Sequence, residues 1–201
     1  GDLTLTVSGS VINWQLEAGI TNTSLIKTIS GSVTRNADVI SNTNTSTLIG
    51  QTEGTIFIDY NKVLSNDSAR NIISINDGST TNLIEIWDGV SAGTLGRIVY
   101  IYYANKLGKV TGVGQPTISP SGKYKICLTY IITPSLVNFK FFINGVILDN
   151  RNLTYTAFSS PLSRINIGNR NGANVGQGSH NLCFITKTRI TDEQAIQLTT
   201  L

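Results

Sequence analysis

The amino-acid sequence predicts an all-β protein, a two-sheet antiparallel β-sandwich of the jelly-roll type with a short C-terminal helix. Three observations support this prediction. Short segments of alternating apolar and polar residues, rich in Val, Ile, Thr and Tyr, recur along the chain. Clusters of Gly, Asn, Ser and Pro separate these segments. No helical pattern long enough to connect parallel strands lies between them, which excludes a parallel α/β fold.

Twelve segments have the pattern of a strand. They are Thr4–Ser8, Val11–Leu16, Gly31–Asn36, Gly54–Asn61, Arg70–Asn76, Leu83–Trp87, Arg97–Ala104, Lys123–Ile131, Val137–Ile143, Val146–Leu148, Arg164–Ile167 and Leu182–Arg189. Asn144 and Gly145 predict a type I′ hairpin turn, because both residues tolerate positive φ. The segment Arg97–Ala104 is apolar or aromatic on both faces, which predicts an interior strand whose less buried face lies on the concave outer surface of the sandwich.

The only convincing helix pattern lies close to the end of the sequence, at Asp192–Thr199. Thr191 can cap this helix by accepting a hydrogen bond from the Gln194 amide. The acidic residues Asp192 and Glu193 of the first turn suit the positive end of the helix dipole.

The first 29 residues differ from the rest of the sequence. Residues 1–29 contain two short strands and a polar connector, which we interpret as the end of an upstream unit. Residues 30–201 then form a self-contained sandwich. Alternatively, the early strands belong to one continuous sandwich. The sequence contains no Met and begins with Gly1, so we expect it to be a piece of a longer protein.

The composition limits the classes of partner. Hydrophobic residues make up 40% of the 201 residues, enough for a core, whereas charged residues make up 13%, about half the usual share. The net charge is +3 and the basic residues are dispersed, which disfavours nucleic-acid binding. No apolar run reaches membrane-spanning length, so we expect no membrane insertion. A surface rich in Ser, Thr and Asn suits an extracellular or particle-surface protein.

A set of short motifs in a fixed order carries a resemblance to a known superfamily. The motifs are Gly54-Thr-Ile-Phe-Ile-Asp, Gly122-Lys-Tyr-Lys-Ile-Cys-Leu-Thr-Tyr, Phe142-Ile-Asn-Gly-Val, Ile165-Asn-Ile-Gly and Arg189-Ile-Thr-Asp-Glu-Gln-Ala-Ile-Gln-Leu. In this order they resemble the concanavalin A-like lectin/glucanase superfamily, in its laminin G-like branch. The resemblance implies a concanavalin A-like jelly roll from about Ser30 to Leu201.

A narrower resemblance lies in the connector. The segments Trp14-Gln-Leu-Glu-Ala-Gly-Ile-Thr-Asn-Thr-Ser-Leu-Ile-Lys-Thr and Ser32-Val-Thr-Arg-Asn-Ala-Asp are similar to a connector that precedes laminin G-like domains in bacteriophage structural proteins. Leu25 and Asn36 depart mildly from that pattern. The resemblance implies a location on the virion surface, in a tail fibre, head fibre or decoration protein. Similar domains also occur in bacterial surface proteins.

Together these features predict a non-catalytic module that binds host-surface carbohydrate. Its expected partners are a host cell-surface glycan, other virion subunits and further copies of itself, for example in a trimer. Two alternatives stay open at this point. In the first alternative, the module is a purely structural part for fibre or capsid assembly. In the second, it is an adhesin domain on the bacterial cell surface.

A carbohydrate site needs an aromatic face for the sugar ring and polar groups for its hydroxyls. The loop-adjacent residues that fit this chemistry are Trp87, Asp88, Tyr102, Tyr103, Asn105, Asn169, Arg170 and Asn171. Laminin G-like domains often hold calcium, and Asp77, Asp88 and Asn169 are weak candidates for its oxygen ligands. The alternatives are core packing for the strand aromatics and solvated turns for the polar residues.

Catalytic and redox interpretations are weaker. Glu85 and Asp88 are three residues apart, so on a strand they point to opposite faces and cannot form a glycosidase pair. Glu53 and Asp59 share a face but are six residues apart. His180 has no identifiable triad partners. Cys127 and Cys183 lie in separate expected strands and form no Cys-x-x-Cys motif, which leaves two buried free thiols or one disulfide. We therefore assign no catalytic residue and no required cofactor.

Overall fold

The computed structural model describes residues 39–62, 70–91, 94–105, 110–113, 122–153, 157–172 and 178–201, with residues 6, 8–10, 25, 27, 31 and 33. For residues 89–91, 94–97 and 110–113 it describes the backbone only. The chain divides into two units, Gly1–Ala37 and Asp38–Leu201. The three strands expected before residue 37 and the connector Trp14–Asp38 lie almost entirely outside the described residues. The expected domain boundary after residue 29 stays a prediction.

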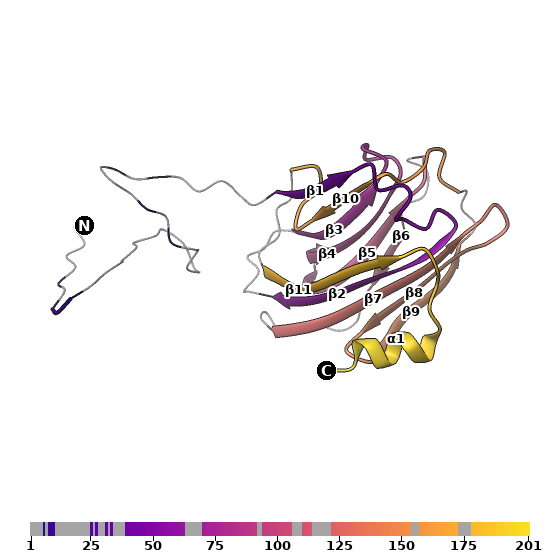
Figure 1. Ribbon diagram of the computed structural model, residues 1–201. Coiled ribbons are helices and arrows are strands. Elements are labelled where there is room, and N and C mark those ends of the chain that lie inside the picture. The colour runs from indigo at the N-terminus through magenta and orange to yellow at the C-terminus, as the bar shows by residue number, and fades with distance from the viewer. Residues whose placement is uncertain are drawn as a thin grey trace. The chain divides into compact units, whose positions relative to one another are not determined.

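The second unit is an antiparallel β-sandwich with one short C-terminal helix, which confirms the predicted fold class (Figure 1). Its elements are β1 (Ile40–Thr43), β2 (Glu53–Lys62), β3 (Arg70–Asn76), β4 (Leu83–Ser91), β5 (Thr94–Tyr103), β6 (Val110–Val113), β7 (Gly122–Ile132), β8 (Val137–Ile143), β9 (Val146–Leu153), β10 (Arg164–Ile167), β11 (Gly178–Thr186) and α1 (Asp192–Thr199). One sheet has six strands in the order β1-β10-β3-β4-β5-β6, and the other has five in the order β11-β2-β7-β8-β9. No helix among the described residues is long and apolar enough to span a membrane.

Most expected strands are present. The elements β3, β8, β10 and α1 have the predicted bounds, and β5 lies between β4 and β6 inside its sheet, as its two apolar faces predicted. The hairpin turn between β8 and β9 has positive φ at Asn144 (49°) and Gly145 (78°), as a type I′ turn requires. Strands β1 and β6 were not predicted. β1 has the sequence Ile-Ser-Asn-Thr and is exposed throughout, so it lacks the apolar alternation that marks a strand. β6 carries a Gly in a run of four residues.

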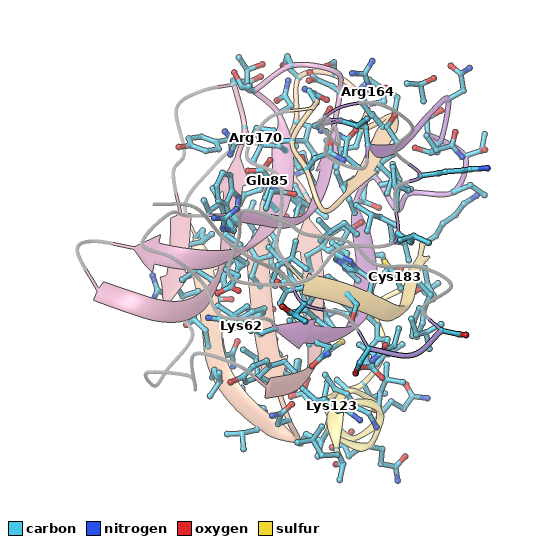
Figure 2. All side chains as sticks on the ribbon, turned by 90° about the vertical axis from the view of Figure 1, so that its left-hand side faces the viewer. Lys62, Glu85, Lys123, Arg164, Arg170 and Cys183 are labelled. Atoms are coloured by element: carbon cyan, nitrogen blue, oxygen red, sulfur yellow. The ribbon has the colours of Figure 1, made fainter. Side chains whose placement is uncertain are left out.

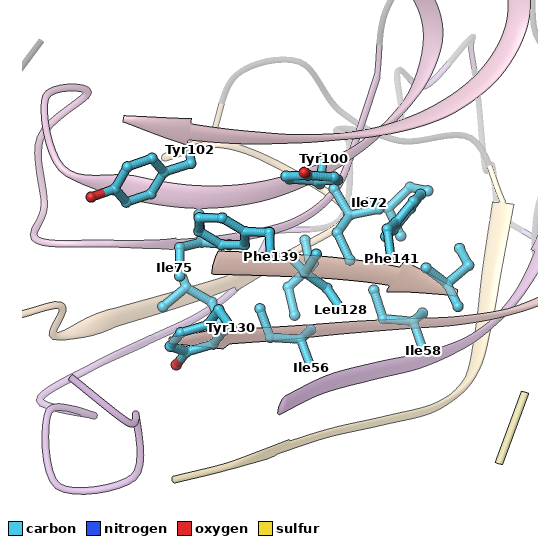
Figure 3. Close-up of a cluster of buried hydrophobic side chains, with 14 of the residues drawn as sticks. Ile56, Ile58, Ile72, Ile75, Tyr100, Tyr102, Leu128, Tyr130, Phe139 and Phe141 are labelled. Atoms are coloured by element: carbon cyan, nitrogen blue, oxygen red, sulfur yellow. The ribbon is translucent and has the colours of Figure 1, made fainter. Parts of the chain in front are cut away.

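The core lies between the two sheets and is rich in Ile and aromatic side chains (Figure 3). Tyr100 of β5 stacks on Phe139 of β8 across the interface, with the ring centroids 5.4 Å apart. Tyr102 lies two residues further along β5 on the same face. Its ring centroid is 5.1 Å from that of Phe139. Such aromatic pairs add about 0.5–1.5 kcal/mol each beyond the area they bury. The inward-facing residues of β5 therefore hold the six-stranded sheet against the five-stranded one.

Helix α1 covers the outer face of the five-stranded sheet. A second apolar cluster lies there, in which Ala195 of the helix packs with Phe57, Cys127 and Phe142 from three strands. Cys183 instead packs against the core between the sheets. The two cysteines lie on opposite faces of this sheet and both are free thiols, which excludes the disulfide alternative.

A capping box fixes the start of α1, as the sequence predicted for Thr191. The Gln194 amide donates to Thr191 Oγ1 at 3.3 Å, and the Thr191 amide donates to Gln194 Oε1 at 2.9 Å. We expect Thr191→Ala to lower the free energy of unfolding by about 1 kcal/mol, because one N–H group of the first turn loses its partner. Urea unfolding of the two proteins measures this difference. Thr191→Ser keeps the hydroxyl and should retain most of the stability. An equal loss in both variants would contradict a capping role.

Candidate functional site

The two outer faces of the sandwich differ. Helix α1 packs on the outer face of the five-stranded sheet, whereas no helix of the described residues lies on the outer face of the six-stranded sheet. On that second face the loop Gly168–Gly172 follows β10. We call these five residues, Gly-Asn-Arg-Asn-Gly, the GNRNG loop. The candidate site is therefore the six-stranded sheet beneath this loop.

Polar side chains run across this face from β10 through β3 to β4. Strand alternation places most of them there, because the same strands direct their Ile side chains into the core, and an irregularity of β3 between Asn71 and Ile73 puts Asn71 on the same face. In the register of the sheet, Asn166 pairs with Ser74, Ser74 with Glu85, and Asn71 with Trp87. We call these five residues the polar strip. All five are buried although they belong to an outer face, so other parts of the chain cover them.

The GNRNG loop forms part of this cover. Positive φ at Gly168 (71°), Asn171 (47°) and Gly172 (83°) turns the chain back after β10. The guanidinium of Arg170 then lies 4.7 Å from the centre of the Trp87 ring. Asn169 stabilises the turn, since its Oδ1 accepts from the Gly172 amide at 3.0 Å.

Glu85 is the buried centre of the contacts with the loop. Its Oε1 accepts a hydrogen bond from Arg170 Nε at 2.6 Å, and its Oε2 accepts from Arg170 Nη2 and from Trp87 Nε1, the latter at 2.8 Å. Glu85 is fully buried, while the Arg170 side chain is 21% exposed. Because an unpaired carboxylate is very unfavourable in such a place, the fold requires the arginine there.

The outer part of the loop contacts the other end of the polar strip. Asn171 Oδ1 accepts from Arg164 Nη1 and from Asn166 Nδ2, each at 3.2 Å. Arg164 lies on the same side of the molecule as Arg170 and Glu85 (Figure 2). The side chains of Arg164 and Arg170 therefore lie on this face together with the polar strip, which includes the carboxylate of Glu85.

Three polar atoms of the strip have no hydrogen-bond partner among the described residues. They are Nδ2 and Oδ1 of Asn71 and Oδ1 of Asn166. A buried polar atom without a partner costs about 1–3 kcal/mol, so native proteins contain few of them. Two such side chains on one face are a physical reason to look for a ligand there.

The eight residues predicted from the sequence fall into three groups. Trp87, Arg170 and Asn171 lie together at the polar strip, with Asn169 shaping the loop and Tyr103 paired with Leu83 on the same outer face.

Asp88 and Tyr102 point to the other side of the sheet, into the core, so we leave them out of the proposed site. Asn105 follows β5, where its amide donates to Asn82 Oδ1 at 3.1 Å. Sequence reasoning did not select Asn71, Ser74 and Asn166. The isoleucines on either side of Ser74 and of Asn166 could have indicated that these two residues face outward, whereas Asn71 reaches the same face only through the irregularity of β3 between Asn71 and Ile73.

Asp88 belongs to a buried network between the sheets. Its Oδ1 accepts from Lys62 Nζ at 2.6 Å, and its Oδ2 accepts from the Tyr60 hydroxyl at 3.4 Å. Burial raises the pKa of the Asp88 carboxyl, although the hydrogen bond from Lys62 acts in the opposite direction. Glu85 and Asp88 thus lie on opposite faces of β4, as their spacing predicted.

His180 contacts the backbone and not a catalytic partner. Its Nε2 lies 3.1 Å from the carbonyl oxygen of Ile72, and its ring lies 5.3 Å from that of Tyr60. Burial lowers the pKa of His180. The imidazole therefore links β11 of one sheet to β3 of the other.

The calcium candidates do not converge. Asp77, Asp88 and Asn169 lie in separate places, and no three His, Cys, Asp or Glu side chains of the described residues come close enough to hold a metal ion. Both carboxylate oxygens of Asp77 accept hydrogen bonds, Oδ1 from Ser79 and Oδ2 from Ser160 and Asn82. Asp77 is therefore a turn-forming residue in this structure.

Comparison with known proteins gives the fold. No known family profile matches the sequence, and no curated protein matches it. Among solved structures, the CBM40 module of the Ruminococcus gnavus intramolecular trans-sialidase, bound to α2,3-sialyllactose, is similar with a TM-score of 0.64 and 16% identity. The match covers 83% of this chain and 97% of that one. At this identity, the similarity establishes a shared sandwich fold.

Two further structures show how widely this fold occurs. The NanB sialidase of Streptococcus pneumoniae matches with a TM-score of 0.60 and 12% identity, over 82% of this chain and 27% of that enzyme. A pentraxin of Limulus polyphemus matches with a TM-score of 0.55 and 11% identity, over 76% and 72% of the two chains. The fold is thus shared by part of an enzyme and by a heptameric protein.

The contacts of Arg170 predict a stability effect. Arg170→Ala should lower the free energy of unfolding by about 2–3 kcal/mol, because it leaves the buried carboxylate of Glu85 with one donor. Urea unfolding measures the change. The matched control is Arg151→Ala on the other sheet, where the arginine is 41% exposed and pairs with Asp149 at 3.1 Å. This control should change stability by about 0.5 kcal/mol or less. Similar losses in the two variants would contradict the role of Glu85.

Asp77 predicts a dependence of stability on pH. Burial alone would raise the pKa of this carboxyl, but hydrogen bonds from Ser160, Ser79 and Asn82 lower it to about 2. Since the folded pKa is below the unfolded one, the stabilisation is present above about pH 4 and is lost as the pH falls towards 2. Asp77→Asn should therefore be less stable than the original protein at pH 7, with a smaller difference at pH 2. Urea unfolding at the two pH values tests this; a constant difference would contradict it.

Proposed function

We propose that this chain is a non-catalytic carbohydrate-binding module whose ligand binds the outer face of the six-stranded sheet. The observation that carries the proposal is the polar strip with the GNRNG loop. It combines an aromatic ring, a carboxylate, a guanidinium and unpaired amides on the face that α1 does not cover. These are the groups that contact the apolar ring and the hydroxyls of a sugar.

Arg170 can contribute directly to binding. It uses Nε and Nη2 for Glu85, and this pair leaves Nη1 to donate to a ligand oxygen. Arg164 and Tyr103 add a second guanidinium and a partly exposed phenol on the same face. Because Arg170 lies over the buried Trp87 ring, the indole holds in place the guanidinium that would meet the ligand.

The positions of the carboxylates favour binding over hydrolysis. Glycosidases need two carboxyl groups about 5–9.5 Å apart. Glu85 and Asp88 lie on opposite faces of β4. Glu53 and Asp59 share a face of β2 but are separated by six residues, which corresponds to about 20 Å along a strand. Neither pair fits the reaction.

The fold comparison suggests the first ligands to test. The similar CBM40 module is bound to α2,3-sialyllactose in one structure and to α2,6-sialyllactose in another. The two sialyllactoses, with lactose as the matched compound without the acidic sugar, form one set of probes. Capsular and cell-wall polysaccharides of bacteria form the second set.

The setting that we propose is the surface of a phage particle, in a fibre or decoration protein that contacts host glycan. The support is the similarity of Trp14–Asp38 to connectors in phage structural proteins. Assembly with other virion subunits, for example as a trimer, would present several weak sites at once and strengthen attachment. Antibody labelling of particles in electron micrographs, with labelled bacterial cells in parallel, distinguishes a virion protein from a bacterial adhesin.

Trp87 provides the test of the binding site. The sequence contains two tryptophans, Trp14 and Trp87, so Trp14→Phe leaves a fluorescent group at the proposed site alone. We expect a glycan that binds to change this fluorescence with a saturable titration. Trp87→Ala should weaken binding at least tenfold on a glycan array, because it removes the ring beneath Arg170.

The controls separate binding from folding. Arg151→Ala should bind as the original protein does, and near-UV circular dichroism reports whether each variant is folded. Should Trp87→Ala not fold, Tyr103→Ala tests the same face and should also weaken binding. If no glycan of either set binds the folded protein, the proposal is wrong and a structural role in assembly is favoured.

A further inference from the structure

We propose that Asn71 determines the specificity of this site by binding two adjacent hydroxyl groups of the sugar. This inference rests on the proposed function and names the chemical group that the site selects. Asn71 lies on β3 opposite Trp87 of β4, and the sheet has an irregularity between Asn71 and Ile73. Its side chain is fully buried, yet neither atom of its amide has a partner among the described residues.

The unpaired atoms of Asn71 restrict what the ligand can offer. Nδ2 can only donate a hydrogen bond and Oδ1 can only accept one. A carboxylate could not donate to Oδ1, and an ammonium group could not accept from Nδ2. Two neighbouring hydroxyls satisfy both atoms, because each hydroxyl can donate and accept. The chemistry of Asn71 therefore matches a vicinal diol.

Asn166 extends this requirement along the face. Its Oδ1 is a second buried acceptor without a partner, on the neighbouring strand β10. Asn166 pairs with Ser74, and the partners of Ser74 and Asn71 on β4, Glu85 and Trp87, are two residue spacings apart, so the two positions are separated by ~7 Å along the sheet. A sugar residue that reaches both positions must present hydroxyl donors at both. The positive charge of Arg170 is already paired with Glu85, so hydroxyls, and not the charge of an acidic sugar, supply the selective contacts at this position.

Access to Asn71 depends on the GNRNG loop. The loop begins beside it, since the Gly168 amide donates to the carbonyl oxygen of Ile72 at 2.8 Å. Arg170 lies over the neighbouring Trp87 and is the partly exposed member of the group. Rotation of this side chain away from the indole breaks its hydrogen bonds to Glu85, so a ligand hydroxyl that enters here must replace the guanidinium as a donor to that carboxylate. Glycines with positive φ at both ends of the loop allow a further adjustment of the backbone.

The test combines two variants with chemical treatment of the glycan. The probes are the arrayed bacterial polysaccharides and sialyllactoses, each untreated, mildly oxidised with periodate, or fully oxidised. Mild periodate cleaves the diol of the sialic acid side chain, while full oxidation also cleaves ring diols. We expect oxidation to abolish binding of the recognised glycan, and the two treatments identify which diol is bound. Asn71→Ala should weaken binding about 30-fold, as expected for two lost hydrogen bonds.

A direct readout and a matched control complete the experiment. The side-chain NH₂ signal of Asn71, assigned by its loss in Asn71→Asp, should shift in the NMR spectrum when the recognised glycan is added. The control is Asn138→Ala on the other sheet, whose amide donates to Asn150, Asn152 and the carbonyl oxygen of Arg151. This variant should bind normally while it is folded.

Two results separate the two proposals. If the original protein binds a glycan but Asn71→Ala binds it equally well, or the NH₂ signal does not shift, then Asn71 is not the specificity residue and glycan binding stands. If the original protein binds none of the probes, both proposals fail together.

Discussion

Strand β4 is buried on both faces along Leu83–Asp88, and the rest of the structure depends on this constraint. Its even-numbered isoleucines enter the core, and Glu85 and Trp87 are covered on the opposite side. A strand buried on both faces is expected to be almost wholly apolar, yet β4 carries two carboxylates. Each must find a partner on its own side, because a buried charge without a partner would be very unfavourable.

The partners of these carboxylates connect distant parts of the chain. Inside the sandwich, Lys62 of β2 pairs with Asp88 and joins the two sheets. Outside, Arg170 pairs with Glu85 and holds the GNRNG loop on the sheet. Strand β4 thus holds the two sheets together through Asp88 and holds the GNRNG loop on the candidate site through Glu85.

This arrangement affects how the proposed site can recognise a ligand. The guanidinium of Arg170 serves the stability of the fold, so its charge is partly used before any ligand arrives. The selective contacts of the proposed site then come from Asn71 and Asn166, because the protein leaves polar atoms of these two amides without a hydrogen bond. Recognition by amides suits neutral hydroxyl groups, and in the proposed particle setting repeated display would compensate for the modest affinity of such contacts.

Several features of the molecule were accessible from the sequence alone. Local patterns determined most strands of the sandwich, the Asn144–Gly145 turn and the capped helix at Thr191, because each depends on residues that are neighbours in the chain. Alternation along one strand also determined that Glu85 and Asp88 point apart. β1 escaped prediction, since an exposed edge strand needs no apolar pattern and is held by its hydrogen bonds to β10.

The membership of the site was decided by the tertiary structure. Trp87 and Arg170 were selected from the sequence as residues of suitable chemistry, but their contact with each other depends on a loop that returns across two strands. Asn71 looked like any polar strand residue until the sheet register placed it beside Trp87 and burial left its amide without a partner. By itself, the sequence determined most strands of the sandwich and which residues of a regular strand share a face, because these are properties of local geometry. Only the tertiary structure decided which faces are covered and which polar atoms remain unpaired, because burial depends on segments far apart in the chain.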